Sequence, residues 1–187
     1  MNDNPFLVRS KILEDNQEYL SKAVITISNI FSDVINNGGK LIFAGNGGSA
    51  AEAQHMSAEY VGTLVTSNKR KPISSLSLTT DTSFITAWSN DQGYEDIFRR
   101  QLEALAQEND CFISYSTSGE SKNILKAIKF ASSKNLKTIS FTGSKDSSIA
   151  KASDFTFRAP SENTAIIQEI HTIVGHEICS IVDKQFS

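Results

Sequence analysis

The sequence predicts an α/β protein with three layers, in which a five-stranded parallel sheet lies between helices and a long helix precedes it. From about residue 40 onward, short apolar stretches alternate with longer stretches of helical periodicity. Strands that alternate with helices pair in parallel through right-handed crossovers, which places helices on both faces of the sheet. The chain of 187 residues has room for one domain, with 1–37 as an N-terminal helical segment and 38–187 as the sheet core.

The first predicted element is an amphipathic helix over about 5–37, in one or two pieces. Its apolar residues recur at steps of three and four. The stretch Asn36-Asn37-Gly38-Gly39 then tolerates a left-handed backbone and ends the helix. A short buried strand follows over 40–44.

The later elements follow from the same two periodicities. Short apolar runs predict strands over 73–78, 111–115, 138–142 and 154–158. Helical patterns cover 49–62, 82–88, 94–106, 122–133 and 164–183. Ligands of open parallel sheets bind beyond the carboxyl ends of the strands. Chemistry is therefore expected in the loops after Ala44, Leu78, Tyr115 and Thr142.

Composition excludes several classes of function. With 18 Lys and Arg against 21 Asp and Glu, the chain lacks the broad basic surface that nucleic-acid binding requires. The one basic cluster, Lys69-Arg70-Lys71, is interpreted as a solvated loop. Cys111 and Cys179 stand in apolar surroundings, which predicts buried thiols in a reducing cytosol. No signal peptide or run of 18 apolar residues is present, so a soluble cytoplasmic protein that does not enter a membrane is expected.

The first candidate loop is Gly45-Asn46-Gly47-Gly48-Ser49, between a strand and a helix. Its small residues would let backbone N–H groups approach a polar or anionic ligand. The spacing matches neither the dinucleotide fingerprint nor the P-loop, so no nucleotide cofactor is expected. A capping box, Ser49-Ala50-Ala51-Glu52, explains part of the motif equally well without any ligand.

The second candidate loop is Ser116-Thr117-Ser118-Gly119-Glu120-Ser121. Four hydroxyl groups, a glycine and the free N–H groups of a helix start favour a phosphate site. A serine-rich turn capped by Ser118 or Ser121 would explain only one of the hydroxyls. Asn90 and Asp91 lie in a predicted polar turn, where they could bind sugar hydroxyls or form an Asx turn.

All three histidines lie in two predicted helices. His55 and Glu59 are four residues apart and share one face. In the late helix, Gln168 lies between the directions of His171 and His176, so one of these histidines could face the site while the other packs or caps. Imidazole, carboxylate and amide oxygen together could ligate zinc and leave one position open.

These motifs, in this order, resemble the phosphoheptose isomerase branch of the sugar isomerase (SIS) domain family over about residues 40–183. The resemblance rests on 45–51, Gln54-His55, Ala58-Glu59, Asn90-Asp91, 116–119 and 167–171 with His176. It implies a flavodoxin-like five-stranded sheet and a homotetramer with sites between subunits, in which the N-terminal segment packs. It also implies one zinc ion per subunit and conversion of D-sedoheptulose 7-phosphate to D-glycero-D-manno-heptose 7-phosphate.

The resemblance also assigns roles. It implies that His55, Glu59, Gln168 and His176 hold the metal, and that Glu59 and His176 form the acid/base pair of an enediol mechanism. His171 is left as a support or interface residue. The residues implied to bind substrate are Asn46, Gly47, Gly48, Glu59, Asn90, Asp91, Ser116, Thr117, Ser118, Ser121 and Gln168.

Some residues depart from the family pattern, and two other functions compete. Ile166 stands where the family commonly has arginine, Tyr115 replaces an aliphatic residue, and 144–148 is less rich in glycine. One alternative is a non-catalytic SIS protein that binds the bacterial replication initiator, but such a relative lacks the equivalents of Glu59 and His176. Another is an SIS enzyme for pentose or amino-sugar phosphates. The paired histidine segments favour the heptose isomerase.

Overall fold

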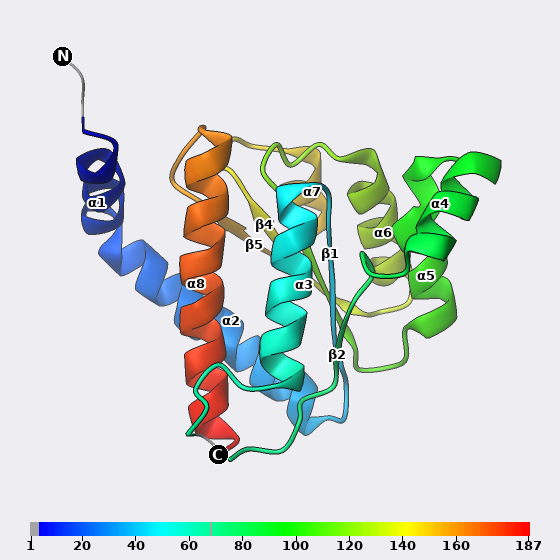
Figure 1. The fold of residues 1–187 in the computed structure, drawn as a ribbon, viewed down its shortest axis with the longest axis horizontal. Helices are drawn as coiled ribbons and strands as arrows, with labels where there is room; N and C mark the ends of the chain where they lie inside the picture. The colour runs from blue at the N-terminus through cyan, green and yellow to red at the C-terminus, as the bar shows by residue number, and fades with distance from the viewer. Residues whose placement is uncertain (1–3, 68) are drawn as a thin grey trace.

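A computed structural model describes residues 4–67 and 69–187, and it contains one sheet of five parallel strands (Figure 1). Along the sheet the order is β2-β1-β3-β4-β5. The strands are β1 (Leu41–Gly45), β2 (Ser75–Ser77), β3 (Cys111–Ser116), β4 (Lys137–Thr142) and β5 (Phe155–Arg158). The predicted three-layer fold is confirmed.

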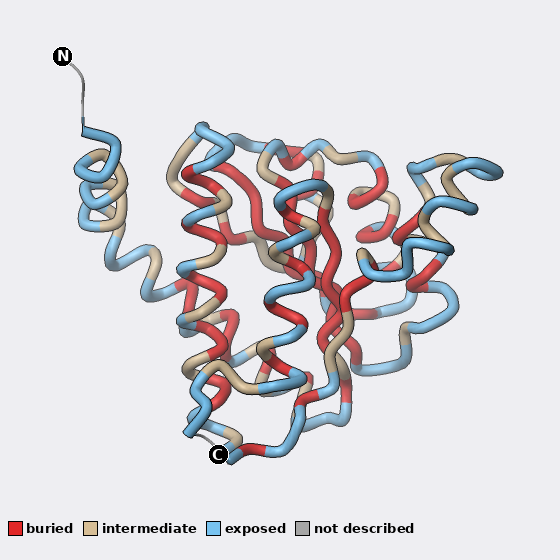
Figure 2. The backbone as a smooth tube through the Cα atoms, in the orientation of Figure 1, coloured by how far each residue is buried: buried red, intermediate tan, exposed pale blue. Residues whose placement is uncertain are grey.

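Helices cover both faces of the sheet. One face packs against α2 (Gln17–Asn36), α3 (Gly48–Val61) and α8 (Thr164–Gln185) through an apolar core that includes Phe31, Phe43 and Ile170. The other face packs against α5 (Ile97–Leu105), α6 (Lys122–Ser133) and the short α7 (Ser148–Ala152). The main chain of each central strand is buried between these two cores, as Figure 2 shows.

The strand order fixes where the two candidate loops meet. After β1 the chain crosses over to β2 on one side of it, whereas after β3 the chain crosses over to β4 in the opposite direction. β1 and β3 are neighbours and pair along Leu41–Gly45. Such a reversal of strand order opens a crevice at the carboxyl ends of the two strands. The loops that begin at Asn46 and Thr117 both leave the sheet at this crevice.

The predicted N-terminal helix is divided at Asn16 into α1 (Pro5–Asp15) and α2. None of the residues of α1 is buried, and α1 lies apart from the body of the protein at the N-terminal end (Figures 1 and 2). Arg9 ties it to α8 through hydrogen bonds of 2.6 and 3.0 Å to the Glu169 carboxylate. Phe6 and Leu7 are exposed.

Several boundaries differ from those predicted. The strand over 73–78 shortens to β2, and α7 was not predicted. α4 (Thr82–Asp91) extends beyond Trp88, so Asn90 and Asp91 lie in its last turn and not in a polar turn. The helix predicted over 94–106 begins as a 3-10 turn, η1 (Tyr94–Asp96), before α5. Gly93, with φ of 98°, separates α4 from η1.

The capping-box prediction was wrong. α3 begins one residue earlier than predicted, with Gly47 at the N-cap in a positive φ of 57° that favours glycine. Ser49 therefore lies inside the helix and is buried. Glu52 turns to α8, where its carboxylate accepts a 2.7 Å hydrogen bond from the Thr172 hydroxyl. Helix capping therefore does not explain why a glutamate stands at position 52.

Two further predictions concern buried and basic residues. Cys111 and Cys179 are both buried and carry free thiols, as expected. The interpretation of Lys69-Arg70-Lys71 as a solvated loop was wrong for Arg70, whose side chain is fully buried against Asp183. Within 4–67 and 69–187, no helix is long and apolar enough to cross a membrane.

His171 supports the core, as predicted. Its ring is buried among Tyr115, Phe141 and Phe157, and Nε2 lies 3.1 Å from the carbonyl oxygen of Thr142 at the end of β4. Burial lowers the pKa of His171 to about 4 from the ordinary 6.5, although the hydrogen bond to Thr142 acts in the opposite direction. Ile166 is also buried and packs in this core.

The low pKa of His171 predicts a loss of stability in acid. Between pH 6.5 and about 4 the unfolded chain binds a proton that the folded chain excludes, so the free energy of unfolding falls as the pH falls. Replacing His171 by Gln removes the titration and keeps a donor for Thr142. Urea unfolding at pH 7.5 and 4.5 should show wild type losing roughly 2 kcal/mol more than His171→Gln. Equal losses in the two proteins would contradict this account.

Candidate active site

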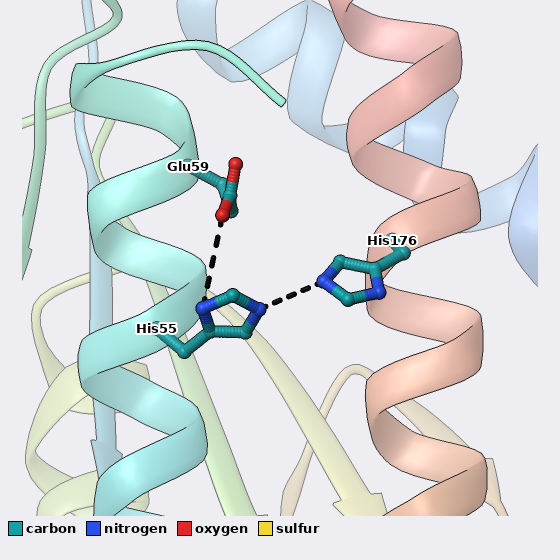
Figure 3. A group of neighbouring side chains, drawn as sticks. All are labelled: His55, Glu59 and His176. Atoms are coloured by element: carbon teal, nitrogen blue, oxygen red, sulfur yellow. Dashed lines mark hydrogen bonds and ion pairs between the residues drawn. The ribbon is translucent and has the colours of Figure 1, made fainter. Parts of the chain in front are cut away.

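Two neighbouring helices, α3 and α8, bring the predicted acid, base and metal residues together (Figures 1 and 3). The Nε2 atoms of His55 and His176 lie 2.7 Å apart, and Nδ1 of His55 lies 3.7 Å from Oε1 of Glu59. One ligand atom from each of the three residues lies within 4.8 Å of the others. His55 is exposed, while Glu59 and His176 are partly buried, so the cluster is open to small molecules.

Gly175 allows the two helices to approach this closely. A Cβ atom at this position would lie 2.6 Å from the Met56 sulfur and 3.5 Å from Oε1 of Glu52. A larger residue would therefore require the Met56 side chain, or the two helices, to move. His176 is the next residue, so this close packing lies directly beside the histidine pair.

Glu52 lies on the same face of α3 as His55 and Glu59, and the sequence analysis missed it as a site residue. One of its oxygens accepts the hydrogen bond from Thr172, whereas Oε1 is buried and has no hydrogen-bond partner among the described residues. Burial raises the pKa of the Glu52 carboxyl, while Thr172, His55 and His176 lower it by less. The spacing 52, 55, 59 repeats at three and four residues, which is the signal that could have identified it.

The first loop is held by a pair of side-chain amides. Nδ2 of Asn46 donates to Oδ1 of Asn123 at 3.0 Å, and Nδ2 of Asn123 donates back to Oδ1 of Asn46 at 2.9 Å. The Tyr94 hydroxyl donates to the same Asn46 oxygen at 2.8 Å. The Asn46 amide therefore joins the first loop to the start of α6, which directly follows the second loop. Asn123 and Tyr94 were not predicted as site residues.

The second loop presents hydroxyl groups at the start of α6. The hydroxyls of Ser116 and Ser121 share a 3.0 Å hydrogen bond, and Ser118 Oγ accepts from the Glu120 N–H at 3.2 Å. Thr117 and Ser118 line a hollow of about 260 Å³ with Gly143. A larger hollow of about 1130 Å³ lies at the amino ends of the strands, away from the histidines.

Other predicted residues lie outside the three-residue cluster. The side-chain amide of Gln168 lies against Gly48, because a Cβ on Gly48 would be 2.6 Å from its Nε2. Gln168 is eight residues before His176, or roughly 12 Å along α8. Asn90 donates to the carboxylate of Asp91 at 2.8 Å, and both are exposed. The roles of these residues stay predictions.

The cluster has the composition of a catalytic zinc site. Two imidazoles and one carboxylate form a known set of protein ligands for zinc that leaves a fourth position for water or substrate. His55, Glu59 and His176 direct their donor atoms toward one another, which fits a small cation held between α3 and α8. The same residues are suited to moving protons.

A parallel sheet with a serine loop at its strand reversal and a cluster of two histidines and a glutamate beside it agrees with the resemblance to sugar isomerase domains. The sequence profile of the SIS domain matches residues 8–143. The chain is 41% identical over 182 residues to a phosphoheptose isomerase of Helicobacter pylori strain Shi470, covering 97% of this chain and 94% of that one. It is 42% identical over 177 residues to the phosphoheptose isomerase of Aneurinibacillus thermoaerophilus, covering 95% and 87%. The chain belongs to the phosphoheptose isomerase family of SIS-domain proteins.

Solved structures agree with this assignment. A phosphoheptose isomerase from Francisella tularensis superposes with a TM-score of 0.90 at 32% identity, covering 96% of this chain and 94% of that one. The enzyme from Neisseria gonorrhoeae gives 0.88 at 32% identity, with 96% and 95% covered. The fold is therefore shared over nearly the whole chain.

Because the Glu52 carboxyl is largely buried, replacing it by a neutral side chain is expected to stabilise the folded protein. A carboxyl whose folded pKa is raised costs stability as the pH rises above its unfolded value of 4.5. Glu52→Gln should therefore raise the melting temperature at pH 7, by about 2–4 °C per kcal/mol relieved, and lose this advantage below pH 4.5. Glu177→Gln, at an exposed position of α8, is the control and should change little. A lower melting temperature for Glu52→Gln at pH 7 would contradict the argument.

Proposed function

We propose that this protein is a sugar phosphate isomerase that converts D-sedoheptulose 7-phosphate to D-glycero-D-manno-heptose 7-phosphate for heptose synthesis. The observation that carries the proposal is the convergence of His55, Glu59 and His176 between α3 and α8. Membership of the phosphoheptose isomerase family supports this substrate.

The residue types fit ketose–aldose isomerisation. The reaction needs a base that removes a carbon-bound proton beside a carbonyl, and a group that moves a proton between two oxygens of the enediol. Glu59 takes the first role and His176 the second. Both side chains lie on the same side of the α3–α8 pair, within reach of one bound molecule (Figure 3).

We also propose that His55, Glu59 and His176 hold one zinc ion per subunit, with Gln168 as the further predicted ligand. A zinc ion bound there would supply Lewis-acid polarisation of the substrate carbonyl. The donor set supports zinc because imidazole nitrogen and carboxylate oxygen are its common ligands. His55, which has no proton-transfer role in this proposal, would act through the metal.

The loops at the carboxyl edge would bind the rest of the substrate. Ser116, Thr117, Ser118 and Ser121 would hold the phosphate with the N–H groups at the start of α6. Phosphate binding at a distance from the carbonyl would fix the reacting carbons by remote binding energy. The backbone of Gly47 and Gly48 and the side chains of Asn90, Asp91 and Gln168 complete the proposed set. Asn46 was predicted to bind substrate, but its side-chain hydrogen bonds to Asn123 favour a role in holding the first loop in place.

The proposal extends to assembly and location. Phe6 and Leu7 on α1 expose large apolar side chains, which supports a homotetramer in which the N-terminal segment packs against other copies. The two free, buried thiols support a cytoplasmic location. A non-catalytic SIS protein would have no need of the convergent Glu59 and His176, so the enzyme is favoured.

The direct test is incubation of the purified protein with D-sedoheptulose 7-phosphate, with aldose formation followed by chromatography or NMR. Pentose and amino-sugar phosphates serve as competing substrates. Preferred turnover of the heptulose phosphate supports the proposal. No turnover of it with or without added zinc would refute it.

Glu59→Gln should abolish turnover, with kcat reduced by about 100- to 10,000-fold, since that is the usual contribution of a positioned acid or base. The amide keeps the size of the side chain but cannot accept the proton. The assembly state should stay unchanged by size-exclusion chromatography. Activity near that of wild type would remove Glu59 from the mechanism.

His55→Ala should weaken zinc binding by at least about 100-fold, since even the loss of a residue outside the ligand set commonly costs 10–100-fold. Titration of the metal-free protein with zinc, read by calorimetry, measures the change. His171→Gln, at a buried position away from the cluster, is the matched control and should bind zinc as wild type does. Equal affinity in all three proteins would place the metal elsewhere.

A further inference from the structure

We propose that the buried ion pair of Arg70 and Asp183 positions Glu59 opposite His176, so that both residues are positioning residues for the site. This inference rests on the proposed function, because it concerns the geometry of the proposed base and metal ligand. Both side chains are 0% exposed, and Nε of Arg70 lies 2.5 Å from Oδ1 of Asp183. Among the described residues, neither forms a hydrogen bond or an ion pair with His55 or His176.

Arg70 binds the main chain of the helix end that carries Glu59. Its Nη2 donates to the carbonyl oxygen of Glu59 at 2.8 Å, and its Nη1 donates to those of Tyr60 and Lys71 at 2.9 and 3.1 Å. The last carbonyls of a helix have no partner within the helix. A guanidinium offers five donors in a rigid plane, and its charge is favourable at a helix C-terminus. Arg70 therefore fixes the turn of α3 in which Glu59 lies.

Asp183 carries this restraint to α8. It follows His176 by seven residues, almost two helical turns, and so lies on nearly the same face of the helix. One carboxylate oxygen binds Arg70, and the other accepts from Thr63 Oγ1 at 3.0 Å and from the Leu64 N–H at 3.1 Å. The chain that leaves α3 is thus bound to the helix that carries His176.

The pair joins the two halves of the cluster at the end opposite to Gly48 and Gln168. At the other end of α3, Gly48 contacts Gln168 of α8. Between these two contacts lie His55 and Glu59. In the described part of the chain, the Glu59 carboxylate has no hydrogen bond of its own, and Oε1 lies 3.7 Å from Nδ1 of His55. The backbone at Glu59 therefore sets the point from which this side chain extends toward His55 and His176.

Stability alone is a poor explanation for this ion pair. Buried ion pairs lose in desolvation much of what they gain in attraction, and apolar replacements are often equally stable. Removal of one partner, by contrast, leaves an unpaired buried charge and shifts the groups bound to it. What an apolar pair could not provide is directed hydrogen bonding to the carbonyl of Glu59. The ion pair accordingly serves to hold the end of α3 at a fixed position relative to α8.

The test compares Asp183→Asn with Asp110→Asn, because each variant removes the charge of a buried aspartate that is paired with a cation. The control pair, Lys40 with Asp110, joins the chain before β1 to the chain before β3, and neither residue belongs to α3 or α8. Arg70→Lys is the second variant, since lysine keeps the charge but cannot bind the same three carbonyls at once. Melting temperatures of all variants are measured first.

The readouts are zinc affinity of the metal-free protein, kcat and KM for D-sedoheptulose 7-phosphate, and the imidazole NMR signals of His55 and His176. Asp183→Asn and Arg70→Lys should bind zinc about 10–100-fold more weakly and lose kcat by a similar factor, with KM changed less than about threefold. Their imidazole signals should shift. Asp110→Asn should lower the melting temperature without these effects.

The inference is overturned if the three variants match in zinc affinity and imidazole signals, because the ion pair would then act on stability alone. If Asp183→Asn fails to fold, Arg70→Lys decides by the same readouts, and Asp183→Glu, which keeps the charge, should restore most of the zinc affinity. Failure of the proposed function would look different. Wild type would then show no turnover, while the zinc and imidazole comparisons between variants would still support or overturn the role of the pair.

Discussion

The close packing of α3 against α8 is the constraint on which the rest of the site depends. The catalytic candidates are divided between these two helices. His55 and His176 face each other at 2.7 Å, and Gly175 lets the Met56 side chain pack against α8 beside them. Both helices pack on the same face of the sheet, so the sheet and its apolar core hold the two helices that carry the cluster. A small change in helix spacing would separate the three side chains of the cluster.

The site has two parts with different origins in the fold. The hydroxyl loop and the glycine loop exist because β1 and β3 are neighbours at the reversal of strand order. The cluster of His55, Glu59 and His176 exists because α3 and α8 run side by side away from that edge. Gln168 and Gly48 lie at the junction, where α8 and α3 begin. The amide pair of Asn46 with Asn123 then fixes the first loop to the helix that begins where the second loop ends.

Much of this arrangement could be predicted from the sequence, because it follows from local patterns. Alternating strands and helices predicted the sheet, and the four-residue spacing of His55 and Glu59 predicted a shared helix face. Long-range contacts could not be predicted in the same way. Arg70 was interpreted as solvated because its neighbours Lys69 and Lys71 are charged, whereas its partner stands over a hundred positions later in the chain. Glu52 was assigned to a cap for the same reason.

The way in which Arg70 contacts α3 also bears on how such a protein can change during evolution. Its guanidinium recognises carbonyl oxygens, which every amino acid possesses, and not the side chains of the residues it holds. The hydrogen bonds from Arg70 to the end of α3 therefore do not depend on the side chain at position 59. A lineage could exchange the chemical group at the centre of the site and inherit the geometry unchanged, so that new reactions can be tried on this scaffold without first rebuilding it.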